Sequence, residues 1–441
     1  MIRLTISLVL LLALSTAVQA QTREEKVLAD RKKVEAEGFW IYADMAKGFA
    51  AAKKSGKPLL VILRCIPCEE CVKLDDELID QDARVKPLLN EFVCVRIVST
   101  NGLDLALFQF DYDQSFAAFM LNADGTIYGR FGTRSHRTSW AGDVSVEGLA
   151  KALQGALDLH GNYPQNREQL ALKKGPPPQV ASPEKFPSLR DKYGPTITYE
   201  AKVVQSCIHC HQIGDVEREQ FRASGEAIPK NLLFPYPHPK TLGLIFDPKE
   251  KATLESVDRD SLSAQAGFRA GDVILELEGQ PLLSIADVQW VLHQASPLGA
   301  TLQATVLRDG KEQTLTLALP KDWRQRGDID WRASTWGLRR MATGGMVLET
   351  ATAQQRSQAG LSSKGMALHV KFVGQYGPHA AAKQAGFRMG DIIVAFDNQS
   401  NLERESDLLA YALTNCKSGS QVSVAVVRDA KKIEIRLPMQ N

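Results

Sequence analysis

One ten-residue pattern occurs twice in this chain. Residues 266–275 have the sequence AGFRAGDVIL, and residues 385–394 have the sequence AGFRMGDIIV. Each copy is followed by a turn, a helix-like segment and a strand-like segment that ends in Arg-Asp, at residues 302–309 and 422–429. Repetition at this separation predicts two copies of one strand-rich domain with two helices, not a solenoid. We place these domains at residues 240–320 and 321–441.

The start of the chain has the pattern of a secretory signal peptide. Arg3 precedes a short apolar run at residues 8–14, and Val18 and Ala20 supply the small residues of a cleavage site. The run is about half of the ~20 residues that span a bilayer, which favours cleavage after Ala20 over an anchor helix. No later segment has a comparable length of apolar residues. We therefore expect residues 1–20 to be removed, no membrane span in the mature chain, and an exported, periplasmic protein.

Composition narrows the remaining possibilities. Of 441 residues, 44% are hydrophobic and 24% are charged, which excludes a fully disordered chain and a polytopic membrane protein. The chain has 53 basic and 51 acidic residues, so nothing favours nucleic acid as a partner. A length of 441 residues also requires further domains before the repeat.

Residues 21–38 form a charged, helix-prone segment that we expect to be solvated. In residues 39–160 we expect an α/β sandwich. Its predicted elements are a helix at 45–54, strands at 59–63 and 92–98, a hairpin of 116–121 and 127–131 around the turn NADG, and a closing helix at 145–159.

Three of the seven cysteines form two overlapping CxxC pairs, Cys65, Cys68 and Cys71, directly after the strand at 59–63. A helix N-terminus at this position would favour a thiolate. We predict Cys68 as the nucleophile, with Cys71 or Cys65 as the resolving thiol. Two glutamates between Cys68 and Cys71 oppose a low pKa of the thiol. A structural disulfide and a three-thiolate metal site remain alternatives.

The proline-rich residues 161–239, whose triple proline at 176–178 we interpret as a stiff spacer, contain the motif CIHCH at 207–211. This spacing is the attachment signature of c-type haem. It predicts one covalent haem on Cys207 and Cys210, with His211 as the iron ligand. We suggest His238 as the second ligand, because His209 would point elsewhere on a helix. A zinc site that uses Cys207, His209, Cys210 and His211, and a redox CxxC, are the alternatives. Cys94 and Cys416 are predicted to be isolated and buried.

Residues 60–71 resemble the strand and active site of thioredoxin-like domains. The family's cis-proline has no counterpart near Phe116. The repeated motif resembles the PDZ domain in its permuted bacterial arrangement. On this resemblance, a peptide C-terminus would bind beside Leu242, Gly243, Leu244, Ile245 and Phe246 in the first copy, and beside Trp336, Gly337 and Leu338 in the second. Helices at 286–295 and 406–414 would form the groove walls. Residues 342–363 would be an insertion, and the second copy could instead serve only for packing or dimerisation.

As a whole, the chain resembles a bacterial family that joins a thioredoxin-like domain to PDZ domains and includes selenoproteins. The resemblance is strongest at residues 64–68, 108–113, 122–130 and 207–211. It implies a multidomain α+β protein: a thioredoxin-like α/β sandwich, a short haem-binding segment and two PDZ domains. We expect an exported thiol-disulfide redox and electron-transfer protein whose PDZ modules dock a protein or peptide client. The rival expectation is a non-enzymatic scaffold or sensor with structural or metal-binding cysteines. No Ser-His-Asp protease domain precedes the repeats.

Overall fold

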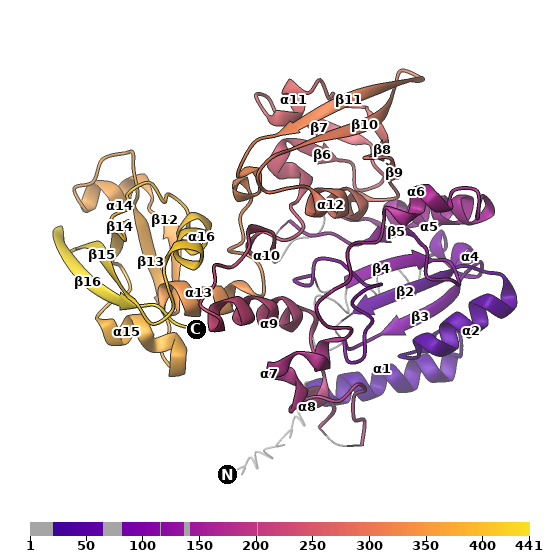
Figure 1. Ribbon diagram of the computed structural model, residues 1–441, viewed down its shortest axis with the longest axis horizontal. Helices are drawn as coiled ribbons and strands as arrows, with labels where there is room; N and C mark the ends of the chain where they lie inside the picture. The colour runs from indigo at the N-terminus through magenta and orange to yellow at the C-terminus, as the bar shows by residue number, and fades with distance from the viewer. Residues whose placement is uncertain (1–20, 65–81, 115, 136–141, 201) are drawn as a thin grey trace, which may run out of the picture.

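The first domain is built on a mixed five-stranded sheet (Figure 1). The computed structural model describes residues 21–64, 82–114, 116–135, 142–200 and 202–441. The strand order is β1-β3-β2-β4-β5, with β1, β2 and β3 parallel and β4 and β5 antiparallel to their neighbours. The elements are β1 (Ile41–Tyr42), α2 (Met45–Ser55), β2 (Leu59–Arg64), α4 (Val85–Leu89), β3 (Val93–Ile97), β4 (Phe116–Leu121), β5 (Ile127–Phe131) and α5 (Val146–Gly161). These bounds confirm the predicted helices, strands and hairpin.

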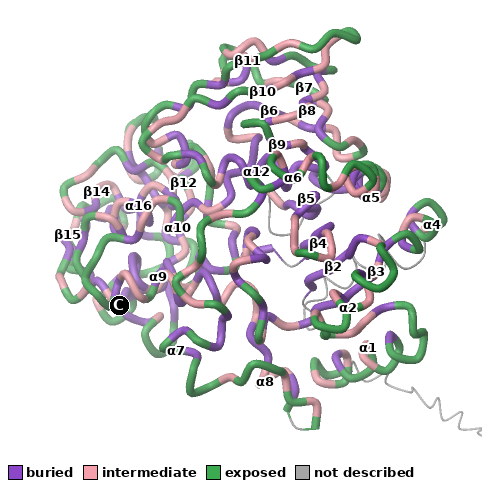
Figure 2. Tube along the Cα trace, turned by 45° about the vertical axis from the view of Figure 1, so that its right-hand side comes forward, coloured by how far each residue is buried: buried purple, intermediate pink, exposed green. Residues whose placement is uncertain are grey.

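The sheet is covered on both faces. Every residue of β2 and β4 is buried, which explains why both strands are continuous apolar runs without alternation. The side chains of one face pack with α4 and α5, and those of the other face pack with α2 and with residues far along the chain. The buried strands at the centre of this domain appear in purple in Figure 2.

The charged segment at 21–38 is only partly as predicted. It forms helix α1 (Arg23–Glu37), but the helix packs on the domain instead of extending into solvent. Val27 and Val34, seven residues apart, are buried, and Tyr42 of β1 donates a hydrogen bond to Asp30 over 2.9 Å. The two apolar positions were too few to reveal this face among so many charges.

Residues 161–239 contain several helices, which the prolines and the lack of periodicity gave no reason to expect, whereas the triple proline at 176–178 lies outside them. The helices pack on the first domain, and the last two of them lie between that domain and the two later modules (Figure 1). In chain order the helices are α6 (Arg167–Ala171), η2 (Pro183–Lys185), α7 (Pro187–Arg190), α8 (Val203–Ser206), α9 (Cys210–Ala223) and α10 (Lys230–Leu233). Ile213 and Val216 of α9 are buried in the core of the first domain, so this segment completes that domain.

The two repeats form two separate antiparallel modules. The first contains η3 (Pro239–Leu242), β6 (Leu244–Phe246), β7 (Leu254–Val257), α11 (Leu262–Gln265), β8 (Val273–Leu277), β9 (Gln280–Pro281), α12 (Ile285–Gln294), β10 (Ala300–Arg308) and β11 (Lys311–Leu319). η4 (Trp323–Arg326) follows β11 and packs in the core of the first module through Trp323. The second module contains α13 (Thr335–Thr343), β12 (Met346–Thr350), α14 (Ala353–Gln358), β13 (Leu368–Val373), η5 (Gly377–Ala380), α15 (Ala381–Ala385), β14 (Ile392–Phe396), α16 (Glu405–Asn415), β15 (Gln421–Arg428) and β16 (Lys431–Pro438).

The repeated motif has a structural reason. Its aspartate, Asp272 in the first copy, accepts the backbone N–H of Arg269 and is held by the guanidinium of Arg308, 2.6 Å away. Asp391 of the second copy has the equivalent partners, the backbone N–H of Arg388 and the guanidinium of Arg428. The glycine before each aspartate has a positive φ, which residues with a side chain rarely adopt. The Gly-Asp pair and the distant arginine therefore stabilise the same turn in each module.

The first module is fixed to the first domain through α12. Ser284, just before this helix, donates a hydrogen bond to the carbonyl of Arg130 on β5 over 2.6 Å. Trp290 packs under the Arg130 guanidinium, 3.9 Å from its ring centroid. Helix α12 is accordingly buried along most of its length (Figure 2). Within the described residues, no helix has the length and apolar character that crossing a membrane requires.

Candidate functional site: an interdomain cavity beside the cysteine motif

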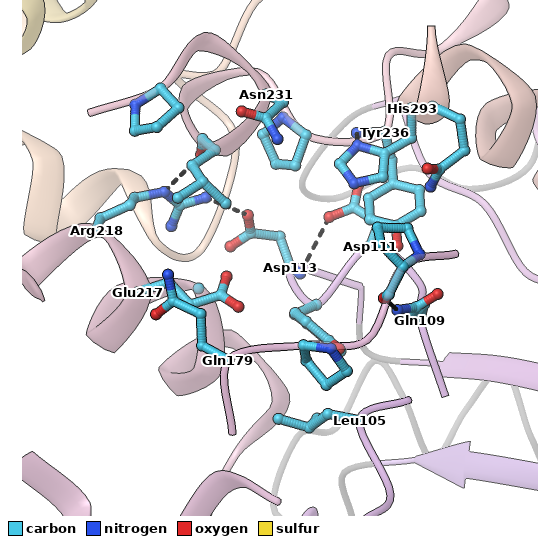
Figure 3. Close-up of a pocket in the computed structure, with 18 of the residues that line it drawn as sticks. Leu105, Gln109, Asp111, Asp113, Gln179, Glu217, Arg218, Asn231, Tyr236 and His293 are labelled. Atoms are coloured by element: carbon cyan, nitrogen blue, oxygen red, sulfur yellow. Dashed lines mark hydrogen bonds and ion pairs between the residues drawn. The ribbon is translucent and has the colours of Figure 1, made fainter. Parts of the chain in front are cut away.

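A cavity of about 670 Å³ lies where the first domain, helix α9 and the first module meet. This volume is within the range of small-molecule sites. Aromatic side chains contribute much of its wall: Tyr112, Phe221, Tyr236 and Trp290. Figure 3 shows Glu217 and Arg218 of α9 on one side, and Tyr236 and His293 on the other. Sequence reasoning missed this cavity, because its lining comes from segments far apart in the chain.

Arg218 is one of two arginines in the cavity wall, with Arg324. The Arg218 side chain is almost fully buried, and its Nε donates a hydrogen bond to the carbonyl of Leu232 over 2.8 Å. Its Nη2 lies 3.8 Å from the carboxylate of Asp113, and its Nη1 has no hydrogen-bond partner among the described residues. Nη1 also lies 3.8 Å from Asp215, so the guanidinium is placed between two carboxylates.

Two buried aspartates lie beside it. Arg332 donates to both carboxylate oxygens of Asp111, at 2.6 and 2.8 Å, and to Asp113 at 3.3 Å. Ser334 donates to Asp113 through its backbone N–H at 2.8 Å and its hydroxyl at 2.9 Å. This network ties the loop of the first domain to the chain that enters the second module. Both aspartates lie within the stretch at 108–113 that carried the family resemblance.

Glu217 of α9 is an acidic residue of the cavity wall. Burial raises the pKa of its carboxyl to about 7, only partly opposed by the charge of Arg218. The unfolded chain would ionise near the ordinary value of 4.5. Between these values the native state binds more protons than the unfolded state, so this group makes stability fall as pH rises from 4.5 to 7.

We predict that Glu217→Gln removes this pH dependence. From pH 4.5 to pH 7, the folding equilibrium constant of the wild-type chain should fall on the order of 100-fold relative to that of the variant. Urea unfolding curves of both proteins from pH 4 to pH 8 measure the difference. Glu219→Gln on the exposed side of α9 serves as the control, and a constant offset between wild type and Glu217→Gln would contradict the prediction.

The motif at 207–211 starts helix α9. His209 is the N-cap residue, and its ring lies parallel to that of His211 with centroids 5.9 Å apart. The prediction that His209 points elsewhere on a helix was therefore wrong, because the helix begins only at Cys210. His211 lines the cavity, and its Nδ1 lies 3.1 Å from Asp215, which raises the pKa of the imidazole. This contact leaves Nε2 as the nitrogen available to a ligand.

The two thiols of the motif lie apart from this cavity. Cys207 is buried, its Sγ donates to the carbonyl of Val203 over 3.2 Å, and burial raises the pKa of the thiol to about 11. Cys210 lines a different, very small pocket together with Arg64 and Ile97. A covalent haem needs both sulfurs and the histidine on one side of the ring. His211 thus fits a haem ligand beside the cavity, whereas the sulfurs as arranged do not fit.

His238, the suggested second iron ligand, lies in another environment. Its Nε2 is 3.4 Å from Asp143, which also binds Lys240 over 2.6 Å, and it lines a separate cavity of about 350 Å³. Burial lowers the pKa of its imidazole. His293, in contrast, lines the same cavity as His211, and burial there lowers its pKa to about 3. Nothing in the sequence indicated that His211 and His293, which lie far apart in the chain, line one cavity.

The structure can be compared with the cysteine predictions only for part of the remaining cysteines. Cys65, Cys68 and Cys71 lie outside the described residues. Cys94 lies in β3, where burial raises the pKa of its thiol to about 12, and Cys416 ends α16 as a buried residue, which confirms both predictions. Within the described ranges, no cluster of three or more His, Cys, Asp or Glu side chains is arranged to hold a metal ion.

The predicted peptide-binding loop of the first module is present. Leu242 ends η3, Gly243 adopts a positive φ of 86°, and Leu244, Ile245 and Phe246 form β6. This strand pairs with β7, and no other described strand pairs with it. β6 is thus an edge strand among the described residues, and edge strands are where PDZ domains add a peptide.

The prediction of the peptide-binding loop of the second module was wrong. Trp336, Gly337 and Leu338 lie inside helix α13. The residues before β12 that match Gly243 are Gly344 and Gly345, with φ of 62° and 88°. The segment at 342–363, expected to be an insertion, therefore contains the loop, β12 and the additional helix α14. Two adjacent glycines before an alternating apolar segment were the available signal.

Comparison with known proteins agrees with this architecture. The thioredoxin-like family matches residues 40–123, and the PDZ domain family matches residues 240–319 and 370–439. The chain therefore contains a thioredoxin-like domain and two PDZ domains. We call the two modules PDZ1 and PDZ2. PDZ domains imply peptide binding.

Curated relatives resemble only part of the chain. The probable periplasmic serine endoprotease DegP-like of Pseudomonas savastanoi pv. phaseolicola is 29% identical over 192 residues, which is 43% of this chain and 35% of the relative. The serine protease Do-like HtrB of Bacillus subtilis is 35% identical over 82 residues, 18% of each chain. A solved structure, the HtrA-type protease AlgW with decapeptide, is 14% identical and covers 32% of this chain and 49% of its own, with a TM-score of 0.20. The chain thus spans about a third of the first relative's length.

Proposed function

We propose that this chain is an exported thiol-disulfide redox protein whose PDZ domains hold the client polypeptide. Cys68 is the attacking thiol, and Cys71 or Cys65 is the resolving thiol. The thioredoxin-like domain and the PDZ pair support the general class, and the periplasmic relative supports export. The specific cysteine roles rest on the sequence motif.

One observation carries the proposal. Strand β2 ends at Arg64, and Cys65 is the next residue in the chain. Arg64 lines the same small pocket as His209 and Cys210 of the second cysteine motif. Part of the second motif is thus packed at the carboxyl end of β2, the strand that directly precedes Cys65 in the sequence.

The chemistry is thiol-disulfide exchange. The Cys68 thiolate attacks a client disulfide, the S–S bond breaks, and one client sulfur leaves as a thiolate. The resolving thiolate then attacks the Cys68 sulfur and releases the second client sulfur. The client gains two electrons, and the protein pair becomes a disulfide that an external dithiol must reduce again. Cys207 is not assigned the attack, because its raised pKa keeps it a thiol at neutral pH.

Alkylation with mass readout tests this assignment. The full chain is equilibrated in glutathione buffers of increasing reducing strength, and its thiols are trapped. We expect the peptide with Cys65, Cys68 and Cys71 to change from one free thiol to three over a physiological range, while buried Cys94 stays constant. A Cys68–Cys71 disulfide that survives every buffer would contradict the proposal. It would instead favour the alternative, a periplasmic scaffold or sensor in which peptide binding is the main function.

Covalent haem on Cys207 and Cys210 is a second candidate function for the motif. It is favoured by His211, whose Nε2 is available beside a cavity of sufficient volume. It is opposed by the positions of the two sulfurs, so we derive no reaction step through a haem. Protein made together with haem-maturation machinery should show a Soret band and the mass of one haem if this candidate is correct, and neither if it is wrong.

A further inference from the structure

The peptide-binding edge of PDZ2 is engaged by the domain itself. β12 is the edge strand of its sheet, so one side of it would be free for an added peptide strand. The backbone N–H of Leu348 on this strand donates instead to Oε1 of Glu405 over 2.8 Å. Glu405 is the first residue of α16, the helix that forms the other wall of the groove. One side chain therefore crosses the groove from wall to wall.

Helix α13 holds this closure in place. Arg339 of α13 donates through Nε to Oε1 of Glu405 over 3.0 Å and also pairs with Oε2 of the same carboxylate. Both side chains are buried, so this ion pair is shielded from water. Leu338 and Met341 of α13 are buried in the same apolar core as Leu348. The helix thus contacts both groove walls, α16 and β12.

The segment before α13 is also fixed. The backbone N–H of Ile329 donates to the Ser406 hydroxyl of α16 over 3.0 Å. Ser334 is bound to Asp113 of the thioredoxin-like domain by the two hydrogen bonds described above. α13 is therefore anchored at its start by one domain and along its length by another, which lowers the entropy that its release would gain.

PDZ1 lacks the same device. Its α12 begins with Ile285, which has no side-chain acceptor for a strand N–H. The chain before β6 enters through the short η3, not through a helix of nine residues such as α13. The two copies of one motif thus differ at the element that decides whether a peptide can add to the edge strand.

We propose that α13 is a built-in ligand that closes the peptide groove of PDZ2, so that only PDZ1 accepts a free C-terminal peptide in the resting chain. PDZ2 opens to a peptide when the Arg339–Glu405 pair is released. This inference depends on the PDZ fold and the described contacts, and it is independent of the redox function proposed above.

Photo-crosslinking of the full chain tests the proposal. The probe is a pool of random decapeptides with a benzophenone group and a free C-terminal carboxylate, and the C-terminally amidated pool is the background control. In wild type we expect carboxylate-dependent crosslinks in PDZ1 and none in residues 346–350. In the double variant Arg339→Met/Glu405→Leu, which replaces the buried ion pair with apolar side chains, crosslinks to residues 346–350 should exceed the background of the amidated pool at least tenfold. Arg340→Met, the adjacent α13 residue that pairs with Glu219, should behave as wild type.

Hydrogen exchange gives a second readout that needs no peptide. The amide of Leu348 should exchange at least tenfold more slowly in wild type than in Arg339→Met/Glu405→Leu, because the variant loses its acceptor. Carboxylate-dependent crosslinks to residues 346–350 in wild type would overturn the proposal. Equal Leu348 exchange in wild type and variant would also overturn it.

Discussion

Replacing Arg332 with methionine is expected to cost about 3–5 kcal/mol, because the change leaves two buried carboxylates without their shared cation. Arg332 binds Asp111 through both carboxylate oxygens and also reaches Asp113. Burial by itself raises the pKa of Asp111, and the charge of Arg332 opposes this effect. Without Arg332, Asp111 would be protonated or would pull water into the core.

The loss should be visible locally. The amide of Ser334 donates to Asp113, so its hydrogen exchange reports the opening of this network. We expect exchange to accelerate by a factor on the order of 100 or more in Arg332→Met. Adding Asp111→Leu should recover much of the stability, since the orphaned carboxylate is removed. Arg31→Met, which breaks an exposed pair with Glu35 on α1, is the control and should change exchange at Ser334 little. If Arg332→Met changed exchange at Ser334 as little as Arg31→Met does, the ion pairs of Arg332 with Asp111 and Asp113 would not be needed for stability.

The sequence was most informative where local pattern and fold agree. β2 and β4 are buried on both faces, so each is a continuous apolar run with readable ends. The hairpin turn at 122–125 and the Gly-Asp motif of the PDZ domains require particular backbone conformations, which restrict the residues to a recognisable set. These elements could be placed to within a residue or two.

Prediction failed where tertiary contacts decide the structure. α13 contains a Trp-Gly-Leu triplet that looks like a binding loop, but its Arg339 is drawn into a pair with a helix 66 positions later. The cavity is similar: Arg218 and Glu217 read as ordinary charged positions of a helix, and only the fold brings them to one cavity with Tyr236 and Trp290. His211 and Cys210 are adjacent in the chain, yet they line different pockets, since consecutive helical side chains point in different directions.

Asp287→Ala should lower the free energy of unfolding about as much as Arg332→Met. Replacing Lys173, the ion-pair partner of Asp287, should lower it much less. Asp287 is buried between PDZ1 and the thioredoxin-like domain, where it accepts the backbone N–H groups of Leu283, at 3.0 Å, and Arg130, at 3.2 Å. Its Oδ1 also lies 3.1 Å from Nζ of the fully buried Lys173. Alanine would orphan two N–H groups and one buried ammonium, with an expected cost of about 3–5 kcal/mol.

Lys173→Met tests the asymmetry of this pair. Burial lowers the pKa of the Lys173 ammonium, and its removal leaves Asp287 with both N–H donors, so we expect a much smaller loss than for Asp287→Ala. Exchange of the Leu283 and Arg130 amides measures both variants at the interface. Glu250→Ala breaks the exposed Lys151 pair between the same two domains and should cost less than about 1 kcal/mol. If Lys173→Met proved as damaging as Asp287→Ala, the ion pair itself, and not the carboxylate's hydrogen bonds, would be what fixes PDZ1 to the thioredoxin-like domain.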